Sequence, residues 1–387
     1  MKKICVFTGA RSEYGLLKPL MDGIAFDKDI QLQIIASGMH LSPEFGLTYK
    51  EIEKDGFEIN EKIEILLSSD TPVGISKSIG LGLISFSESL QRLKPDMAVI
   101  LGDRFEALAF AIACYVSLVP IAHLYGGELT EGSIDEGIRH SITKMSFLHF
   151  TAIDEYKKRV IQLGEQPDRV FNVGALGIDN IKKMKLLTKK NLEQKLNIKF
   201  KKHNLLVTFH PVTLEGMVAE KQFAELLKAL DKLKDTMLIF TKANADVEGR
   251  AINILIDKYA AKNKDKAAAF DSMGQLLYLS TMQYVDAAIG NSSSGIIEAP
   301  SFKIGTINIG DRQRGRIKSE SIIDCKPDFW DIKKAFEILY SKEFQKKLKI
   351  AINPYGNGTA VKKIKNIIKN YEIDAKKKRF YDMEIKI

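Results

Sequence analysis

The chain has 387 residues, a length that predicts two domains rather than one. Its hydrophobic fraction of 45% and charged fraction of 28% are ordinary for a folded protein and argue against a disordered chain. The formal net charge of +9 would allow nucleic-acid binding. Acidic residues accompany the lysines and arginines along most of the chain, however, so a small anionic ligand is favoured and no nucleic-acid partner is expected.

Cysteine usage and hydropathy indicate the compartment. Cys5, Cys114 and Cys325 are isolated and odd in number, which argues against a disulfide framework and fits a reducing cytoplasm. The apolar run at residues 4–7 is too short for the core of a signal peptide. The uncharged stretch at residues 107–124 contains a proline and a histidine, and it favours a helix followed by a strand over a membrane span. We therefore predict a cytoplasmic protein that does not cross a membrane.

Short β-branched runs alternate with longer helical patterns along the chain, which is typical of parallel sheets covered by helices. The first series of runs lies at residues 3–7, 32–36, 97–101 and 120–124. After a Lys-rich segment at 182–202, a second series lies at 205–209, 237–241, 267–270, 285–289 and 305–309. The pattern predicts an α/β protein with two doubly wound, Rossmann-like domains and an interdomain crevice. The expected bounds are 1–178, 179–370 and a tail at 371–387.

Ligands of open parallel sheets bind outside the carboxyl ends of the strands, so the loops there form the predicted site. Five such loops carry unusual polar residues: Thr8-Gly9-Ala10-Arg11, Gly102-Asp103-Arg104, Gly126-Gly127-Glu128, His210-Pro211 and Gly290-Asn291-Ser292-Ser293-Ser294-Gly295.

The segment from Gly290 to Glu298 follows a predicted strand and opens a predicted helix. Backbone N–H groups, the hydroxyls of Ser292, Ser293 and Ser294, and the helix dipole at Gly295 would suit a diphosphate. Glu298, one turn further on, would suit a ribose diol. A helix that is simply capped by serine would have the same sequence.

Arginines could supply further phosphate contacts. Arg312, Arg314 and Arg316 follow the next strand, and Arg11 follows the first. An ion pair with Glu13 is the alternative for Arg11. The first strand is not followed by a Walker A motif or a dinucleotide-binding glycine pattern, so ATP hydrolysis and nicotinamide chemistry are disfavoured.

Acid–base candidates cluster between residues 103 and 140. Asp103 and Glu128 lie at strand ends, and Asp135, Glu136, Arg139 and His140 lie at a predicted helix start. Converging carboxylates would have their pKa values pushed apart, as acid and base roles require. Helix capping is the alternative for Asp135 and Glu136.

His210 ends a strand of the second series, a position that favours a catalytic role for its ring. The remaining histidines are scattered, and none forms a pair at metal-ligand spacing on one predicted helix. We expect neither a metal nor a cofactor.

Together these segments resemble the hydrolysing UDP-N-acetylglucosamine 2-epimerases of bacterial sialic-acid biosynthesis, over nearly the whole chain up to about residue 370. The segments that carry the match in the first half are residues 8–15, Gly38-Met39-His40, Leu101-Gly102-Asp103-Arg104, His123-Leu124-Tyr125-Gly126-Gly127-Glu128, Ile134-Asp135-Glu136 and residues 139–145. In the second half they are Phe209-His210-Pro211, residues 290–298 and Ile309-Gly310-Asp311-Arg312-Gln313.

The resemblance implies a GT-B fold and the release of N-acetylmannosamine and UDP, by elimination of UDP to 2-acetamidoglucal and then hydration. By matching position it implies diphosphate contacts at Arg11, Ser292, Ser293 and Arg312, a ribose contact at Glu298, and catalytic roles for Asp103, Asp135 and His210. Glu13, His40, Arg104 and Arg139 are possible substrate contacts. A UDP-sugar is the expected partner, and a homodimer or homotetramer is the expected assembly.

The chain departs from the family pattern at two positions. Some members have an acid where this chain has Tyr125, and Glu128 is the expected substitute. Related enzymes also carry a lysine where this chain has Leu16, and Lys18 lies nearby.

Several functions stay open beside the hydrolysis of UDP-N-acetylglucosamine. They are the hydrolysing 2-epimerisation of UDP-N,N'-diacetylbacillosamine in legionaminic-acid synthesis, the non-hydrolysing exchange of the two UDP-sugars, a GT-B glycosyltransferase and a catalytically silent UDP-sugar sensor. The loops of Asp103, Asp135 and His210 favour an epimerase over the last two.

Overall fold

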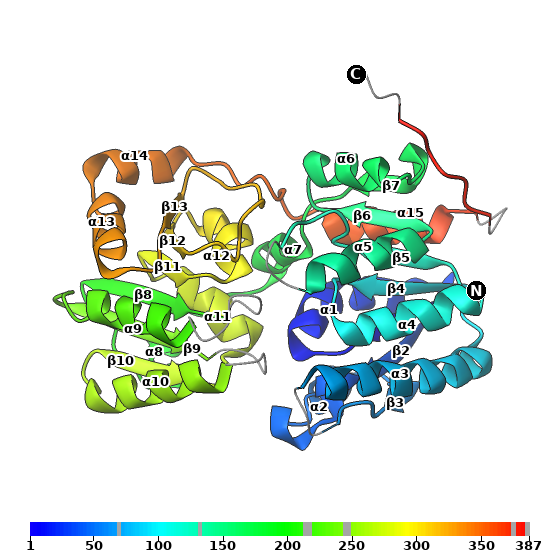
Figure 1. Cartoon of the computed structure of the whole chain (residues 1–387), viewed down its shortest axis with the longest axis horizontal. Helices are drawn as coiled ribbons and strands as arrows, with labels where there is room; N and C mark the ends of the chain where they lie inside the picture. The colour runs from blue at the N-terminus through cyan, green and yellow to red at the C-terminus, as the bar shows by residue number, and fades with distance from the viewer. Residues whose placement is uncertain (68–70, 131–133, 212–218, 243–248, 373–376, 384–387) are drawn as a thin grey trace. The chain divides into compact units, whose positions relative to one another are not determined.

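The computed structural model describes residues 1–67, 71–130, 134–211, 219–242, 249–372 and 377–383. The chain divides into two compact units (Figure 1). Unit 1 comprises Met1–Glu128, Ile134–Asn180 and Tyr355–Ile387, and unit 2 comprises Leu129–Ser133 and Ile181–Pro354. Each unit has its own parallel sheet, so the predicted α/β fold with two doubly wound, Rossmann-like domains is confirmed.

The sheet of unit 1 has the strand order β3-β2-β1-β4-β5-β6-β7, and neighbouring strands pair in parallel. Its strands are β1 (Lys2–Thr8), β2 (Ile30–Ser37), β3 (Glu61–Ile63), β4 (Met97–Leu101), β5 (Ile121–Leu124), β6 (Leu148–Thr151) and β7 (Val170–Asn172). The helices of this half are α1 (Arg11–Ala25), α2 (Tyr49–Lys54), α3 (Pro72–Leu93), α4 (Phe105–Val116), α5 (Asp135–Met145), α6 (Asp154–Gln162), α7 (Leu176–Lys183) and α15 (Ala360–Asn370).

Alternate residues of β1 point into different cores, because side chains of a strand alternate between the two faces of a sheet. Ile4 and Val6 pack with buried residues of α1 and α15. Cys5 and Phe7 pack with buried residues of α3 and α4 on the other face. The strand is therefore apolar at every position from Ile4 to Phe7, as expected for a parallel sheet covered on both sides.

Unit 2 has the strand order β10-β9-β8-β11-β12-β13, also parallel. Its strands are β8 (His203–Thr208), β9 (Thr236–Thr241), β10 (Ala267–Phe270), β11 (Ala287–Gly290), β12 (Gly305–Ile309) and β13 (Ile322–Cys325). The helices are α8 (Lys189–Leu196), α9 (Ala219–Leu230), α10 (Gly249–Lys262), α11 (Gly274–Met282), α12 (Ser293–Ile297), α13 (Phe329–Leu339) and α14 (Lys342–Ile350). Leu205 and Val207 face one core and Leu206 faces the other.

Sequence periodicity located the strands of both sheet centres to within about two residues, but it missed β3, β6, β7 and β13. These are short, and all four lie at or next to a sheet edge. The uncharged stretch at 107–124 forms α4 followed by β5, as predicted. Within the described residues, no helix is long and apolar enough to cross a membrane.

The last helix groups with unit 1, whereas the sequence-based bounds assigned residues up to 370 to the second domain. Its first turn is capped from unit 1, because the Asp179 carboxylate accepts hydrogen bonds from the N–H groups of Ala360 (2.9 Å) and Val361 (3.3 Å). Its lysines Lys365 and Lys369 pair with Asp27, which lies just beyond Phe26, the C-cap of α1. Such long-range contacts cannot be read from the local pattern.

The described end of the chain is held by a buried carboxylate. Glu165 accepts hydrogen bonds from Lys144 (2.7 Å), His149 (2.9 Å) and Lys378 (2.6 Å), and these partners lower its pKa to about 2 against the opposing effect of burial. Lys376, a residue of the predicted tail at 371–387, lies outside the described residues. Lys378 also donates to the carbonyls of Lys144 and Ser146 at the end of α5.

Candidate functional site

Each sheet has a point where the strand order reverses, and the predicted loops meet there. In unit 1 the loops after β1 and β4 are neighbours, because these two strands pair. In unit 2 the loops after β8 and β11 are neighbours for the same reason. Doubly wound sheets bind ligands at this switch point. The fold therefore brings the predicted residues of each half together within that half.

Buried carboxylates dominate the switch point of unit 1. The Glu13 side chain turns back and accepts the N–H of Gly9 at 2.7 Å. Glu106 has no exposed surface and pairs with Arg104 at 3.2 Å. Burial raises the pKa of Glu13 to about 7, the Arg104 charge opposes the rise, and the Glu106 charge adds to it. This group can therefore exchange a proton near neutral pH.

Arg139 connects the predicted catalytic residues of unit 1. Its guanidinium, only 2% exposed, contacts the Asp103 carboxylate, the Glu136 carboxylate at 3.0 Å and the Glu128 carbonyl at 2.9 Å. Glu136 also bonds to the His140 ring at 3.0 Å. These contacts suit Arg139 to holding carboxylates in place more than to binding a substrate itself.

Asp135 is the first residue of α5, and Glu128 is buried in the loop that follows β5. The N-cap residue of α5 is Ile134, whose side chain makes no capping hydrogen bond, and Glu136 faces Arg139 and His140. Tyr125 adopts φ +68° and packs against the core of β1, α1 and α15. Glu128 stays the predicted substitute for the acid that the family pattern has at position 125.

His40 and Arg11 have supporting contacts. Both nitrogens of the buried His40 ring are bonded, to Thr8 at 2.9 Å and to Thr48 at 2.8 Å, and burial lowers its pKa to about 4. Because both ring nitrogens are bonded within the protein, the His40 ring is suited to supporting the loop after β1 more than to contacting a substrate. Arg11 pairs with Glu51 at 3.3 Å, and not with Glu13 as the alternative had it.

In unit 2 the switch point is held through backbone atoms. The Asn291 amide accepts the N–H of His210 and donates to its carbonyl, both at 2.7 Å. The Asn291 carbonyl in turn accepts from Arg312 (3.1 Å) and Gln313 (2.9 Å). Burial, and to a lesser degree Arg312, lowers the pKa of His210 to about 3, so its ring is neutral at physiological pH.

The segment from Gly290 to Glu298, the predicted nucleotide motif, forms the turn between β11 and the short helix α12. Gly290 has φ +126°, and a Cβ there would lie 1.9 Å from the Thr208 carbonyl oxygen, so only glycine fits. Ser292 is the N-cap of α12, and its hydroxyl accepts the N–H of Ser294 at 3.4 Å. The capping explanation thus holds for Ser292, and it leaves open a phosphate role for the following N–H groups. Glu298 is the C-cap of α12.

Sequence reasoning missed three residues of this region. Asn291 lay inside the recognised motif, but its role as the clamp of His210 depends on a partner 81 residues away. Gln313 is adjacent to Arg312 and buried against the same carbonyl. Tyr278 of α11 lies among Ser294, Glu298, Thr208 and Ser292, and burial raises its pKa to about 12. No signal in its own segment pointed to that neighbourhood.

A family model described as UDP-N-acetylglucosamine 2-epimerase matches residues 23–369. The chain belongs to this family. A Campylobacter jejuni protein named GDP/UDP-N,N'-diacetylbacillosamine 2-epimerase (hydrolyzing) is 52% identical over 89% of each chain. The Escherichia coli polysialic acid biosynthesis protein P7 is 39% identical over 99% of this chain and 98% of its own. A Legionella pneumophila UDP-N,N'-diacetylbacillosamine 2-epimerase (hydrolyzing) is 33% identical over 95% and 96%.

Solved structures of the family share the fold of this epimerase. The Neisseria meningitidis UDP-GlcNAc 2-epimerase bound to UDP-GlcNAc has a TM-score of 0.81 at 19% identity, covering 96% of this chain and 100% of its own. The Methanocaldococcus jannaschii enzyme in complex with UDP-GlcNAc and UDP has a TM-score of 0.78 at 20% identity, covering 95% and 99%. These similarities support the GT-B-like class of fold.

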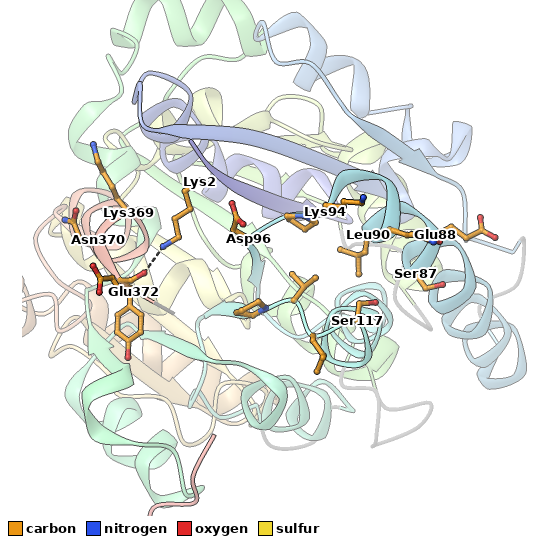
Figure 2. A pocket seen from close by; sticks show the side chains of 16 residues that line it. Lys2, Ser87, Glu88, Leu90, Lys94, Asp96, Ser117, Lys369, Asn370 and Glu372 are labelled. Carbon is orange, nitrogen blue, oxygen red and sulfur yellow. Dashed lines mark hydrogen bonds between the residues drawn. The ribbon is translucent and has the colours of Figure 1, made fainter. Parts of the chain in front are cut away.

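Unit 1 also has a large hollow (Figure 2). It has a volume of about 1150 Å³ and is lined by residues at the amino ends of β1, β4 and β5, including Lys2, Asp96 and Pro120. Lys2 donates there to the carbonyls of Ile368 (2.7 Å) and Tyr371 (2.8 Å). The hollow opens at the amino ends of the strands, whereas such sheets bind ligands at the carboxyl ends. We therefore place the site at the switch points.

Among the described residues, no group of three or more His, Cys, Asp and Glu side chains is arranged to hold a metal ion.

Proposed function

We propose that this epimerase hydrolyses UDP-N,N'-diacetylbacillosamine, releasing UDP and the free sugar inverted at C2. The observation that carries the proposal is the 52% identity, over 89% of both chains, with the C. jejuni hydrolysing 2-epimerase named for that sugar. The L. pneumophila relative named for the same UDP-sugar supports it. From the residues alone, UDP-N-acetylglucosamine is the first expectation and this substrate the second, and the relatives favour the second.

The proposed reaction has two steps and needs no oxidant. In the first, a base removes the C2 proton while the C1–O bond breaks, and its electron pair leaves with UDP to give a 2-acetamidoglycal. In the second, water adds a hydroxyl group to C1 and a proton returns to C2 from the opposite face. The protein must supply a base, an acid and a stabiliser for the departing diphosphate.

The switch point of unit 1 is suited to the proton transfers. Asp103, Glu128 and Asp135 would share the acid and base roles, and the Arg139 contacts hold the first two segments at α5. Burial raises the pKa of Glu13 to about 7, so this carboxyl group keeps a proton available near neutral pH.

The switch point of unit 2 is suited to the nucleotide. The N–H groups that open α12 and the Arg312 guanidinium would stabilise the diphosphate. Glu298 would accept hydrogen bonds from the ribose. The His210 ring, neutral before binding, can accept a proton when the negative diphosphate arrives, since an anion nearby raises the pKa of a histidine. The proposed diphosphate contacts are Arg11, Ser292, Ser293, Ser294, Gly295 and Arg312.

Hydrolysis of UDP-N-acetylglucosamine to N-acetylmannosamine is the second candidate. The description of the family model supports this substrate, as does a Neisseria meningitidis relative named UDP-N-acetylglucosamine 2-epimerase, which is 32% identical over 84% of this chain. The name of the E. coli polysialic acid biosynthesis protein P7 supports a role in sialic-acid biosynthesis. The two sugars differ at C4 and C6, and a pocket distinguishes such small groups by about 1–3 kcal/mol each.

Turnover assays with each nucleotide sugar separate these candidates. Purified protein is incubated with UDP-N,N'-diacetylbacillosamine, its GDP counterpart and UDP-N-acetylglucosamine, and the products are identified by NMR. We expect free C2-inverted sugar and UDP, with kcat/KM for UDP-N,N'-diacetylbacillosamine at least about tenfold above that for UDP-N-acetylglucosamine. A reversed preference would establish the second candidate, and recovery of only the C2-inverted UDP-sugar would exclude hydrolysis.

A further inference from the structure

His123 occupies a central position in unit 1, although it was not among the predicted site residues. It lies in β5, pairs in register with Ile100 of β4, and has no exposed surface. Its Nε2 lies 2.8 Å from the Gly102 carbonyl oxygen, and its Nδ1 lies 3.2 Å from the Thr143 hydroxyl. The ring therefore joins the loop after β4 to helix α5.

The partners of the ring determine its tautomer. A carbonyl oxygen can only accept, so Nε2 carries the hydrogen and donates it to Gly102. Burial lowers the pKa of His123 to about 3, so Nδ1 carries no second proton at neutral pH. Nδ1 thus faces the Thr143 hydroxyl as an acceptor, and that hydroxyl shares its single hydrogen between Nδ1 and the Arg139 carbonyl oxygen. A ring with one donor, one acceptor and no exposed surface is not placed to transfer protons to a substrate.

The two partners of His123 lead to the two ends of the Asp103–Arg139 ion pair. Gly102 directly precedes Asp103 and adopts φ +79°, which favours glycine. Thr143 lies one turn after Arg139 on α5, and its hydroxyl is 3.0 Å from the Arg139 carbonyl. Asp103 and Arg139 are in contact. The contacts close a circuit through five residues: Asp103, Gly102, His123, Thr143 and Arg139.

Space for this circuit is provided by Gly126. A Cβ at Gly126 would lie 3.1 Å from the Thr143 hydroxyl and 3.2 Å from Nδ1 of His123, so a side chain there would push the pair apart. The loop that carries Glu128 is thus shaped around the same contact.

We propose that His123 is a positioning residue that sets the loop of Asp103 against α5 and so fixes the Asp103 carboxylate and Arg139 for the reaction. This inference rests on the proposed function, because it assigns His123 a part in the same proton-transfer site. A displaced catalytic group can cost about 10²-fold in rate without a change in the nucleotide contacts.

The test compares His123→Leu, His123→Gln and Thr143→Val in the full chain. Leucine removes both ring hydrogen bonds, whereas the glutamine amide can still donate to the Gly102 carbonyl. Thr143→Val removes only the hydroxyl. His203→Leu is the matched control, since His203 is a half-exposed histidine of unit 2 that pairs with Asp286.

We expect His123→Leu to lower kcat by about 10- to 100-fold while UDP affinity, measured by calorimetry, stays within about threefold. His123→Gln should recover much of the loss, Thr143→Val should lose at least about threefold in kcat, and the control should match the wild type. A kcat of His123→Leu within twofold of wild type would overturn the proposal. If that variant does not fold, an unchanged kcat of Thr143→Val would overturn it.

Crystal structures of the same variants separate this inference from the proposed function. If the wild type turns over none of the nucleotide sugars, the proposed function fails, and the positioning role is then decided by geometry alone. Loss of the Asp103–Arg139 contact in His123→Leu, or in Thr143→Val if leucine prevents folding, supports the role. An unmoved contact overturns it.

Discussion

The two switch points share a topology but differ in the chemical groups that hold their loops. In unit 1 charged side chains gather around the loop after β4, including the pairs Arg104–Glu106 and Arg139–Asp103. In unit 2 the loops after β8 and β11 meet through amide and backbone groups, with Asn291 bonded to both sides of the His210 backbone. Proton transfer needs groups that change charge, whereas a diphosphate needs fixed N–H dipoles. Under the proposed function, one fold supplies both kinds of group through its loops alone.

The largest expected effect tests the chemical role of unit 1. Asp103→Asn should lower kcat by about 10²- to 10⁴-fold, because the amide cannot take a proton, while UDP affinity measured by calorimetry changes little. Asp154→Asn, at an exposed helix start in the same unit, is the control and should keep wild-type turnover. A weakened UDP affinity with unchanged kcat would move Asp103 to the nucleotide site.

His210 is the exception to the division between proton transfer in unit 1 and nucleotide binding in unit 2. It lies in unit 2 but is a predicted catalytic residue. His210→Ala should reduce kcat by about 10²-fold or more with UDP binding preserved, because Asn291 holds the backbone and not the ring of position 210. Single-turnover measurements and calorimetry would check both quantities. If only UDP affinity fell, unit 2 would be a nucleotide site and nothing more.

The nucleotide role of unit 2 predicts a smaller change. Arg312→Ala should raise the Kd of UDP about 10- to 150-fold, since a charge-assisted hydrogen bond contributes about 1.5–3 kcal/mol. The exposed Arg314 of the same loop is the matched control, and Arg314→Ala should bind UDP like the wild type. Equal affinities of the two variants would exclude Arg312 from the site.

Acid should destabilise unit 1 more than unit 2. Burial lowers the pKa of His40, His123 and His149 in unit 1 and of His210 in unit 2 below 6.5, so each stabilises the fold above pH 6.5 and loses this contribution as the pH falls below it. Glu13 has the opposite sign: its raised pKa of about 7 gives stability below 4.5 that is lost as the pH rises through 7, so it offsets one histidine. Each group changes the free energy of unfolding by at most about 1.4 kcal/mol per pH unit.

Hydrogen exchange measured at pH 7, 6 and 5 would compare the two units directly. Core amides of β1 and β4 should lose more protection than those of β8 and β11, after correction for the intrinsic exchange rate. Equal losses in both units would contradict the assignment of these histidines as neutral.

The smallest expected effect is on the stability of unit 1 and comes from the end of the chain. Lys378→Ala should lower the free energy of unfolding by about 1–3 kcal/mol, because it removes one of the cations bonded to the buried Glu165 carboxylate. The neighbouring Lys377 is exposed, so Lys377→Ala should melt like the wild type in a thermal scan. Identical melting of both variants would show that Lys144 and His149 suffice for Glu165.

Local patterns were enough for the elements that form the centre of each sheet and for the loops that follow them. The run from Ile4 to Phe7 is apolar because both faces of β1 are covered, and that alone predicts a central parallel strand. Edge strands such as β3 and β7 are only three residues long, too short for a periodic signal. The nucleotide motif was visible because its turn, cap and helix start lie within nine consecutive residues at 290–298.

By itself, therefore, the sequence determined the class of fold, the strand-end loops and the family resemblance, since each depends on residues that are neighbours in the chain. Only the tertiary structure decided which side chains meet. Arg139 reaches Asp103 across 36 positions, Asn291 reaches His210 across 81, and Lys378 reaches the end of α5 across more than 200. The physical reason is that the order of strands in a sheet, and not their order in the chain, sets which loops lie side by side.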